Sequence, residues 1–221
     1  MLVLGRISDD PRSHYANLRP LLDYVVARMA DLGIRRGEVL MAQNTAVMQS
    51  YLRAKLVDWI SETPAQALRL EPAGARPLLL AERRGRLRYR TVFFARRDTG
   101  IVDLDGLVGR RLAVQSPAST SAFLVPLGML MDRGLAPTLL PSPRVPAPPG
   151  AVGLLLAGSE HNIAVWVHKG LADAGAFSDH DFEDLERMPA ALREDLVVFA
   201  RSEPFPRAIE LVREDLSSAG P

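Results

Sequence analysis

Residues 116–126 read SPASTSAFLVP and place three consecutive hydroxyl side chains, Ser119, Thr120 and Ser121, at the expected start of an apolar helix. The first N–H groups of a helix have no partner within the helix and carry the positive end of its dipole. Hydroxyl groups and backbone amides at such a start can therefore hold an oxyanion without a cationic side chain. The alternative is an ordinary Ser or Thr cap on a core helix.

The flanking segments favour an anion site over a simple cap. Residues 110–115 (RRLAVQ) have the pattern of a buried strand, and residues 123–133 form the expected helix, which ends at Gly134. Ligands of open α/β sheets bind just beyond the carboxyl ends of the strands, where this turn would lie. We therefore interpret the hydroxyl turn as an oxyanion site.

Strand and helix patterns alternate along the whole chain, which predicts parallel or mixed sheets. Strands are expected at residues 2–7, 38–42, 57–61, 77–81, 88–96, 110–115, 152–156 and 172–177. Helices are expected at residues 15–31, 45–54, 64–69, 123–133, 161–169 and 209–216. The proline-rich residues 137–149 are expected to form an extended surface loop.

The chain resembles the phosphate/phosphite/phosphonate-binding family of type 2 periplasmic binding proteins, which are the substrate-capturing components of ABC importers. The resemblance rests on the strand exit DTGI at 98–101, the segment LDGLVGRR at 104–111 and the S-T-S turn. It implies an α/β, two-lobed type 2 periplasmic-binding-protein fold, in which each lobe is a mixed sheet flanked by helices and the chain makes two hinge crossings. Lobe 1 would comprise residues 1–96 and 192–221, and lobe 2 residues 97–191.

The same resemblance assigns roles to residues at the start of the helix expected at 161–169. In the family a histidine that follows a G-x-x-H-like turn donates to the ligand's oxyanion, and GSEHN at residues 158–162 matches this pattern at His161. Glu160 would be a second polar contact. The alternatives are that His161 only caps the helix and that Glu160 is a first-turn carboxylate favoured by the helix dipole.

Tyr89 and Thr91 match the family's Y-x-S strand, in which a tyrosine and a small hydroxyl line the first-lobe side of the cleft. A strand tyrosine is more often a half-buried packing residue than a ligand contact. The resemblance therefore carries both assignments.

Two positions depart from the family pattern and bear on the ligand. Thr45 lies where phosphonate binders can offer a tyrosine, and Glu62 lies where an aromatic-Gly motif is usual. A carboxylate beside a fully ionised oxyanion would repel it in a poorly solvated cleft. Glu62 could instead accept a hydrogen bond from a protonated phosphate or phosphite, which would exclude sulfate. It could also bind the ammonium group of a zwitterion together with Asp179 and Asp181, or merely cap the following helix.

Composition limits the other classes of function. The 221 residues are 48% hydrophobic and can form one large or two small cores. A formal net charge of +1 gives no general attraction to nucleic acid, and the absence of cysteine excludes disulfides and thiol chemistry. No apolar run reaches the length of a membrane span, and residue 2 begins a strand where a signal peptide could stand. A periplasmic location with the signal removed is expected, and a cytoplasmic one is the alternative.

The expected function is capture of a phosphonate, phosphite or phosphate by hinge closure and its delivery to an ABC permease, without a cofactor and as a monomer. The alternatives are a ligand-sensing domain of a signalling system and a binder of a non-phosphorus zwitterion. Ser119, His161 and Asp179 could be drawn as a catalytic triad, but the chain has no G-x-S-x-G motif, so no enzyme activity is expected. His161 and His168 would lie about 10 Å apart along one helix, so they do not predict a metal site.

Overall fold

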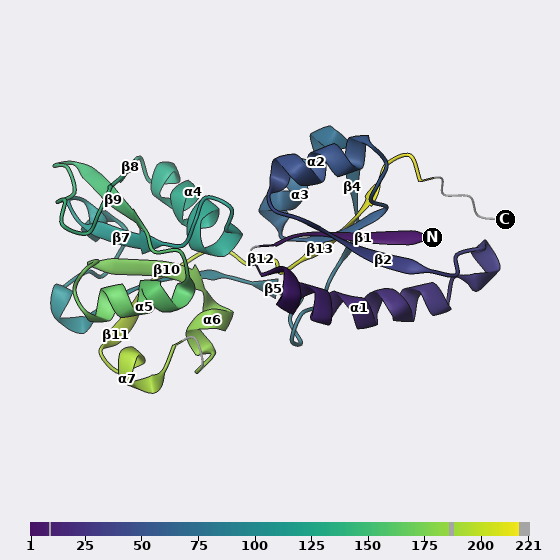
Figure 1. Cartoon of the computed structure of the whole chain (residues 1–221). Helices are drawn as coiled ribbons and strands as arrows, with labels where there is room; N and C mark the ends of the chain where they lie inside the picture. The colour runs from purple at the N-terminus through teal and green to yellow at the C-terminus, as the bar shows by residue number, and fades with distance from the viewer. Residues whose placement is uncertain (9, 186–187, 217–221) are drawn as a thin grey trace. The chain divides into compact units, whose positions relative to one another are not determined.

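The computed structural model describes residues 1–8, 10–185 and 188–216 and divides the chain into two compact units. Unit 1 comprises Met1–Leu87 and Pro206–Pro221, and unit 2 comprises Arg88–Phe205 (Figure 1). The chain therefore passes between the units twice. These boundaries differ from the expected ones, because β6 (Thr91–Arg96) and β11 (Leu196–Arg201), both assigned to lobe 1 from the sequence, pair with each other inside the sheet of unit 2.

The sheet of unit 1 has five strands in the order β2-β1-β3-β13-β4. Strand β1 runs parallel to its neighbours β2 and β3, whereas β13 runs antiparallel to its neighbours β3 and β4. The strands are β1 (Leu2–Ile7), β2 (Gly37–Ala42), β3 (Trp59–Glu62), β4 (Ala75–Leu80) and β13 (Ile209–Arg213). The sheet is thus mixed.

Helices cover both faces of the sheet of unit 1 (Figure 1). Helix α1 (Pro11–Ala27) packs Leu18 and Leu22 against one face, next to Leu4. Helices α2 (Thr45–Arg53) and α3 (Pro64–Leu70) bury Met48 and Leu70 on the other face. Two apolar layers, one on each side of the sheet, therefore stabilise this unit.

The sheet of unit 2 has six strands in the order β11-β6-β10-β7-β9-β8. Four neighbouring strands are parallel, namely β10 (Ala174–Ser178), β7 (Arg111–Val114), β9 (Ala151–Leu156) and β8 (Ala136–Leu139). Strand β6 runs antiparallel to its neighbours β10 and β11. The segments at the two crossings, β5 (Arg88–Tyr89) and β12 (Phe205–Pro206), form a separate two-stranded sheet.

Helices again lie on both faces of the sheet of unit 2 (Figure 1). Helix α4 (Val125–Asp132) packs on one face, and α5 (Glu160–His168), α6 (Asp179–Glu183) and α7 (Ala190–Arg193) lie on the other. Strand β6 contributes side chains to the apolar cores on both faces of the sheet, because Phe93 packs on the α4 side and Phe94 on the α5 side. The predicted fold class, two mixed sheets flanked by helices, is confirmed.

The helix predicted at residues 209–216 is wrong, because Ile209–Arg213 forms strand β13 between β3 and β4. Ile209 and Leu211 point into the core beside α2 and α3. Glu210, between them, accepts hydrogen bonds from Trp59 Nε1 (2.6 Å) and Ser61 Oγ (2.7 Å). This alternation suits a strand, and pairing on both sides outweighs the helix propensity of the segment.

Two smaller expectations also need correction. The expected loop at residues 137–149 begins with the last three residues of β8, which pairs with β9. Helix α1 begins at Pro11, earlier than expected, because the Asp10 carboxylate accepts from the Ser13 amide (3.2 Å) and Pro11 occupies the first helical position.

Gly175 in β10 offers a sharp test of core packing in unit 2. A Cβ atom there would lie 2.6 Å from Ile163 Cγ2 and 2.7 Å from Phe94 Cζ, and both of those side chains are fully buried. Gly175→Ala should therefore lower the free energy of unfolding by about 1–3 kcal/mol in chemical denaturation. The matched control is Gly128→Ala in α4, where the added Cβ meets no atom within 4 Å and should leave stability unchanged or raise it. Equal stability of both variants would contradict this packing.

Candidate functional site

The S-T-S turn follows strand β7 and has a specific local geometry. Ser119 caps the following turn, and its Oγ accepts from the Ala122 amide (3.1 Å). Residues Thr120–Leu124 form a π-helical turn (η5) in which the Leu124 amide donates to the Ser119 carbonyl (3.1 Å), and α4 continues from it. The simple helix start expected from the sequence is therefore wound more widely. Such π-helical turns are rare in proteins, but a large share of those that occur lie at functional sites.

A second helix start lies beside this turn. Strand β9 leads into α5, whose cap Ser159 accepts from the Asn162 amide (3.2 Å). The Gly158 amide donates to the Gln115 carbonyl (3.0 Å), which joins the segment before α5 to the segment before the S-T-S turn. The carboxyl ends of the neighbouring parallel strands β7 and β9 thus carry the two predicted anion-binding turns side by side.

The predicted residues His161 and Glu160 lie at the first turn of α5. His161 is exposed and Glu160 is half-buried. In the S-T-S turn, Ser119 is half-buried, and Thr120 and Ser121 are buried. The structure therefore brings the S-T-S turn and His161 to the same edge of the sheet of unit 2, where the amino ends of two helices add positive potential.

Thr91 and Tyr89 lie in unit 2, not in the first unit where the resemblance placed them. Thr91 is fully buried, and its Oγ1 donates to the Ser121 carbonyl (2.8 Å), so it holds the S-T-S turn from strand β6. Tyr89 is buried, with its ring centroid 4.6 Å from that of Phe205. Thr91 is thus placed to position the turn.

In unit 1, Glu62 is a buried carboxylate at the end of β3, with only 2% of the residue exposed. Its Oε1 accepts from the Ile7 amide (2.8 Å), its Oε2 accepts from the Thr63 amide (3.1 Å), and Arg6 Nη1 lies 3.5 Å from Oε2. Burial raises the pKa of Glu62, against the Arg6 charge and the two amides, which lower it. Glu62 thus joins the ends of β1 and β3.

Glu62 should leave a signature in the pH dependence of stability. Its raised pKa means that the folded state holds the Glu62 proton more tightly than the unfolded state does. The contribution of Glu62 to the free energy of unfolding is therefore greatest at low pH and falls as pH rises through the folded pKa. Subtracting the free energy of unfolding of Glu62→Gln from that of the unmodified protein at each pH should isolate this fall. The matched control is the exposed Glu38→Gln in β2. A difference curve that is flat, or that rises with pH, would contradict the assignment.

The other predicted contacts have local partners. Thr45 Oγ1 donates to Gln66 Oε1 (2.8 Å) and so ties α2 to α3. In unit 2, Asp179 accepts from the Arg90 amide (3.1 Å) and the His180 amide (2.8 Å). Asp181 is buried and lies 2.6 Å from Ser178 Oγ. These residues all contribute to local structure.

Two arginines that the sequence interpretation missed meet at Ser61, at the end of β3. Arg6 Nη1 donates to the Ser61 carbonyl (2.5 Å), and Arg83 Nη2 donates to Ser61 Oγ (2.7 Å). Arg6 comes from β1, and Arg83 follows β4. No local motif marks either residue, because only the pairing of distant strands brings them together.

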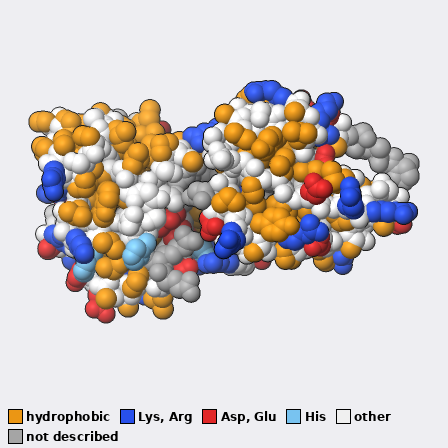
Figure 2. Space-filling view, in the orientation of Figure 1, with side chains coloured by type: hydrophobic (Ala, Val, Ile, Leu, Met, Phe, Trp, Pro, Cys, Tyr) orange, Lys and Arg blue, Asp and Glu red, His pale blue; other side chains and the backbone are white. Residues whose placement is uncertain are grey.

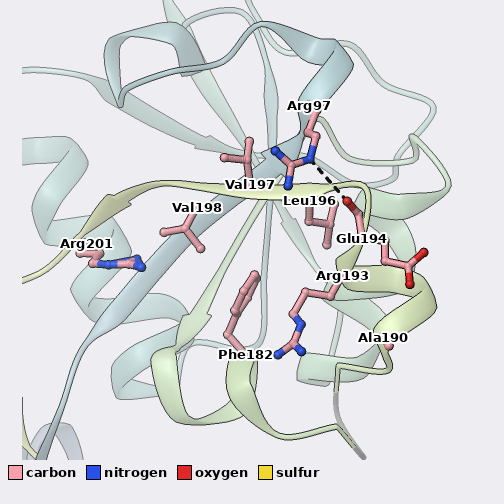
Figure 3. A pocket seen from close by; sticks show the side chains of 9 residues that line it. All are labelled: Arg97, Phe182, Ala190, Arg193, Glu194, Leu196, Val197, Val198 and Arg201. Atoms are coloured by element: carbon pink, nitrogen blue, oxygen red, sulfur yellow. Dashed lines mark hydrogen bonds between the residues drawn. The ribbon is translucent and has the colours of Figure 1, made fainter.

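Unit 2 also has an open groove of about 560 Å³ that is lined by none of the predicted site residues. It lies along β11 and α7, and Figure 3 shows the side chains of Arg97, Arg193 and Arg201 around it. Arg97 Nε donates to the Glu194 carbonyl (3.4 Å). The S-T-S turn follows β7, two strands away from β6, the neighbour of β11. We therefore regard this groove as separate from the candidate site.

Other kinds of site are not evident in the described part of the chain. Residues 1–8, 10–185 and 188–216 contain no set of three His, Cys, Asp or Glu side chains arranged to hold a metal ion. Over the same residues, no helix has the length and apolarity needed to cross a membrane. On the visible face, Lys and Arg side chains are spread out, not gathered into one basic patch (Figure 2).

Comparisons with known proteins identify similar sequences and structures. Residues 6–220 match the model of a family described as ABC transporter, phosphonate, periplasmic substrate-binding protein. The search of curated proteins gave no match. Among solved structures, XAC2383 from Xanthomonas citri bound to chloride ion is 48% identical, with a TM-score of 0.92 over 98% of this chain and 78% of that one. XAC2383 bound to ATP is 47% identical, with a TM-score of 0.91 over 99% of this chain and 78% of that one.

More distant structures share the fold. PhnD1 from Prochlorococcus marinus, in complex with methylphosphonate, has a TM-score of 0.67 at 17% identity, over 97% of this chain and 77% of that one. A binding protein component of an ABC phosphonate transporter from Pseudomonas aeruginosa has a TM-score of 0.66 at 19% identity, over 98% and 70% of the two chains. A histidine kinase sensor domain has a TM-score of 0.54 at 16% identity, over 98% and 83%. The fold therefore occurs in both binding proteins and sensors.

Proposed function

Because this chain belongs to the family of periplasmic substrate-binding proteins of phosphonate ABC transporters, we propose that it captures a phosphonate, phosphite or phosphate and delivers it to an ABC permease. One observation carries the proposal. The S-T-S turn and the His161 helix start lie side by side at the carboxyl ends of β7 and β9. The amino ends of helices, with hydroxyl groups beside them, suit an anion of this size.

Several residues at the carboxyl ends of β7 and β9 would contribute to ligand binding. The Ser119 hydroxyl accepts from the Ala122 amide and keeps its own proton to donate to a ligand oxygen. His161, exposed at the next helix start, would donate from its ring, and Thr91 would keep the turn in place through the Ser121 carbonyl. Binding is proposed to favour a closed arrangement of the two units, which the permease would recognise in the periplasm.

Anions are bound to similar proteins, which supports an anionic ligand for this chain. Methylphosphonate is bound to the Prochlorococcus marinus protein, and chloride and ATP are bound to XAC2383. A phosphate-bearing nucleotide therefore belongs among the ligands to test, beside the small phosphorus oxyanions. The proposal is binding without catalysis, in keeping with a family of binding proteins.

A thermal-shift series tests the proposal on the purified protein. The ligands are phosphate, phosphite, methylphosphonate, an aminoalkylphosphonate, ATP, sulfate and a small zwitterion without phosphorus, all at one ionic strength. A ligand at 100 times its Kd stabilises the folded state by about 2.7 kcal/mol, which raises the Tm by several degrees. The proposal predicts a rise with at least one phosphorus oxyanion. Stabilisation by the zwitterion alone, or by no ligand, would overturn it.

A further inference from the structure

The open groove of about 560 Å³ along β11 and α7 combines an apolar lining with positive charge. Phe182 from α6 and Leu196 and Val198 from β11 supply the apolar part, and all three pack in the core on the α5 side of the sheet. Every residue that lines the groove belongs to unit 2. Three guanidinium side chains surround this lining, those of Arg97, Arg193 and Arg201 (Figure 3).

These positive charges are not neutralised within the described part of the chain. There, the guanidinium groups of Arg193 and Arg201 form no hydrogen bond or ion pair. Arg97 Nε makes only a long hydrogen bond to the Glu194 carbonyl (3.4 Å). Among the residues that line the groove, Glu194 carries the one carboxylate. Three cations against one anion leave the groove with an excess of positive charge.

Strand β11 is also the edge strand of the sheet of unit 2. Over the residues that the structure describes, its backbone hydrogen bonds all join it to β6. An edge strand presents further N–H and C=O groups with which an added extended chain can pair. The six residues of β11 extend about 20 Å. The register shifts between Val198 and Ala200, so an added chain would pair with part of the strand, and side-chain contacts would set the specificity.

Charge decides which kind of chain fits this edge. Two copies of the protein paired through β11 about a two-fold axis would bring the same arginines together, and like charges disfavour that dimer. Figure 3 shows Arg201 at one end of the groove and Arg97 and Arg193 at the other. A chain with carboxylates at both ends and apolar residues between them would match the arginines and the lining at once.

We propose that this groove is a docking site for an extended, acid-rich segment of another protein. The backbone of the segment would pair with part of β11, its apolar side chains would cover Phe182 and Val198, and its carboxylates would meet the arginines. The site is separate from the S-T-S turn, and the inference does not depend on which ligand that turn binds.

Two capped, fluorescein-labelled peptides of eight residues test the charge preference. The acidic probe is EEVTVTEE, and the matched basic probe is KKVTVTKK, which has the same central residues. Fluorescence anisotropy at 50 mM NaCl should show saturable binding of the acidic probe, at least about tenfold tighter than that of the basic probe. Binding should weaken at 300 mM NaCl, because salt screens exposed charges. In ¹⁵N-labelled protein, the amides of residues 196–201 should shift with the acidic probe.

A charge-reversed variant tests the assignment to this groove. Arg193→Glu with Arg201→Glu should reverse the preference, so that the basic probe binds more tightly than the acidic one. The matched control, Arg53→Glu with Arg144→Glu, makes the same change of net charge at exposed positions away from the groove and should keep the preference. Thermal melting checks that both variants fold. If the charge-reversed variant does not fold, Arg193→Gln with Arg201→Gln should abolish the preference.

The outcomes decide the inference without reference to the proposed function. A reversed preference, together with shifts along β11, supports the docking site. Absence of binding, equal binding of the two probes, or an unchanged preference in the folded charge-reversed variant would overturn it. Loss of binding to phosphatidylglycerol vesicles in that variant, without any binding of the acidic probe, would assign the arginines to a membrane surface and would also overturn it. Methylphosphonate affinity should be the same in the variant and the unmodified protein.

Discussion

Replacing Ser119 and Thr120 together by alanine is expected to weaken binding of methylphosphonate about a hundredfold or more. Each hydroxyl would donate a charge-assisted hydrogen bond, and such bonds contribute about 1.5–3 kcal/mol each. At about 1.4 kcal/mol per factor of ten, the loss of two reaches this range. Isothermal titration calorimetry measures the affinity directly.

The same variant should lose little stability. The Ser119 cap on the Ala122 amide is worth about 1 kcal/mol, so the unliganded double variant should melt only a few degrees lower. The matched control is Ser50→Ala with Thr138→Ala, which removes the same two hydroxyl types at exposed positions. Affinity equal to that of this control would show that the turn does not bind the ligand.

The ion pair between Arg111 and Asp173 is expected to be the strongest polar contribution to the stability of unit 2. Arg111 Nε donates to Asp173 Oδ2 (3.1 Å), and Arg111 also donates to the carbonyls of Pro143 (2.8 Å) and Gly170 (3.4 Å). One guanidinium thus joins the start of β7 to two loops. Arg111→Met should lower the free energy of unfolding by about 2–4 kcal/mol, somewhat less than for a fully buried pair, because both side chains keep some exposure.

Chemical denaturation at several pH values measures this contribution. Burial alone would raise the pKa of Asp173, but hydrogen bonds and charge from Arg111 hold it below its usual value. A lowered pKa stabilises the folded state above the unfolded pKa, and this stabilisation is lost as pH falls through the folded pKa. The difference between the protein and Arg111→Met should therefore shrink at low pH. The control Arg133→Met breaks an exposed pair with Asp105 and should change stability by less than about 0.5 kcal/mol. Equal losses in the two variants would contradict this account.

The sequence was sufficient to predict the family, the alternation of strands and helices, and the position of the S-T-S turn after β7. These features are local, since a hydroxyl cluster between a strand pattern and an apolar helix can be recognised within about 25 residues. Strand β13 could not be predicted in this way. Its sequence IELVR suits a helix or a strand, and only β3 and β4 on either side decide between them.

The contacts of Arg6 and Arg83 with Ser61 show the same limit. Arg6 and Arg83 are far apart in sequence and meet only because β1 and β4 belong to one sheet. Glu62 could be singled out from the sequence, but its partners, the amides of Ile7 and Thr63 and the Arg6 side chain, depend on the same pairing. Likewise, the buried position of Thr91 under the Ser121 carbonyl follows from the order of the strands in unit 2.

The most direct test of the central proposal is an NMR titration of the ¹⁵N-labelled protein with methylphosphonate. The backbone amides of residues 119–122 and 160–162 are expected to shift together and to saturate at one ligand per protein. These amides lie at the two helix starts after β7 and β9. If they do not move, while amides along the groove near Arg97, Arg193 and Arg201 do, the ligand binds elsewhere and the proposed site is wrong.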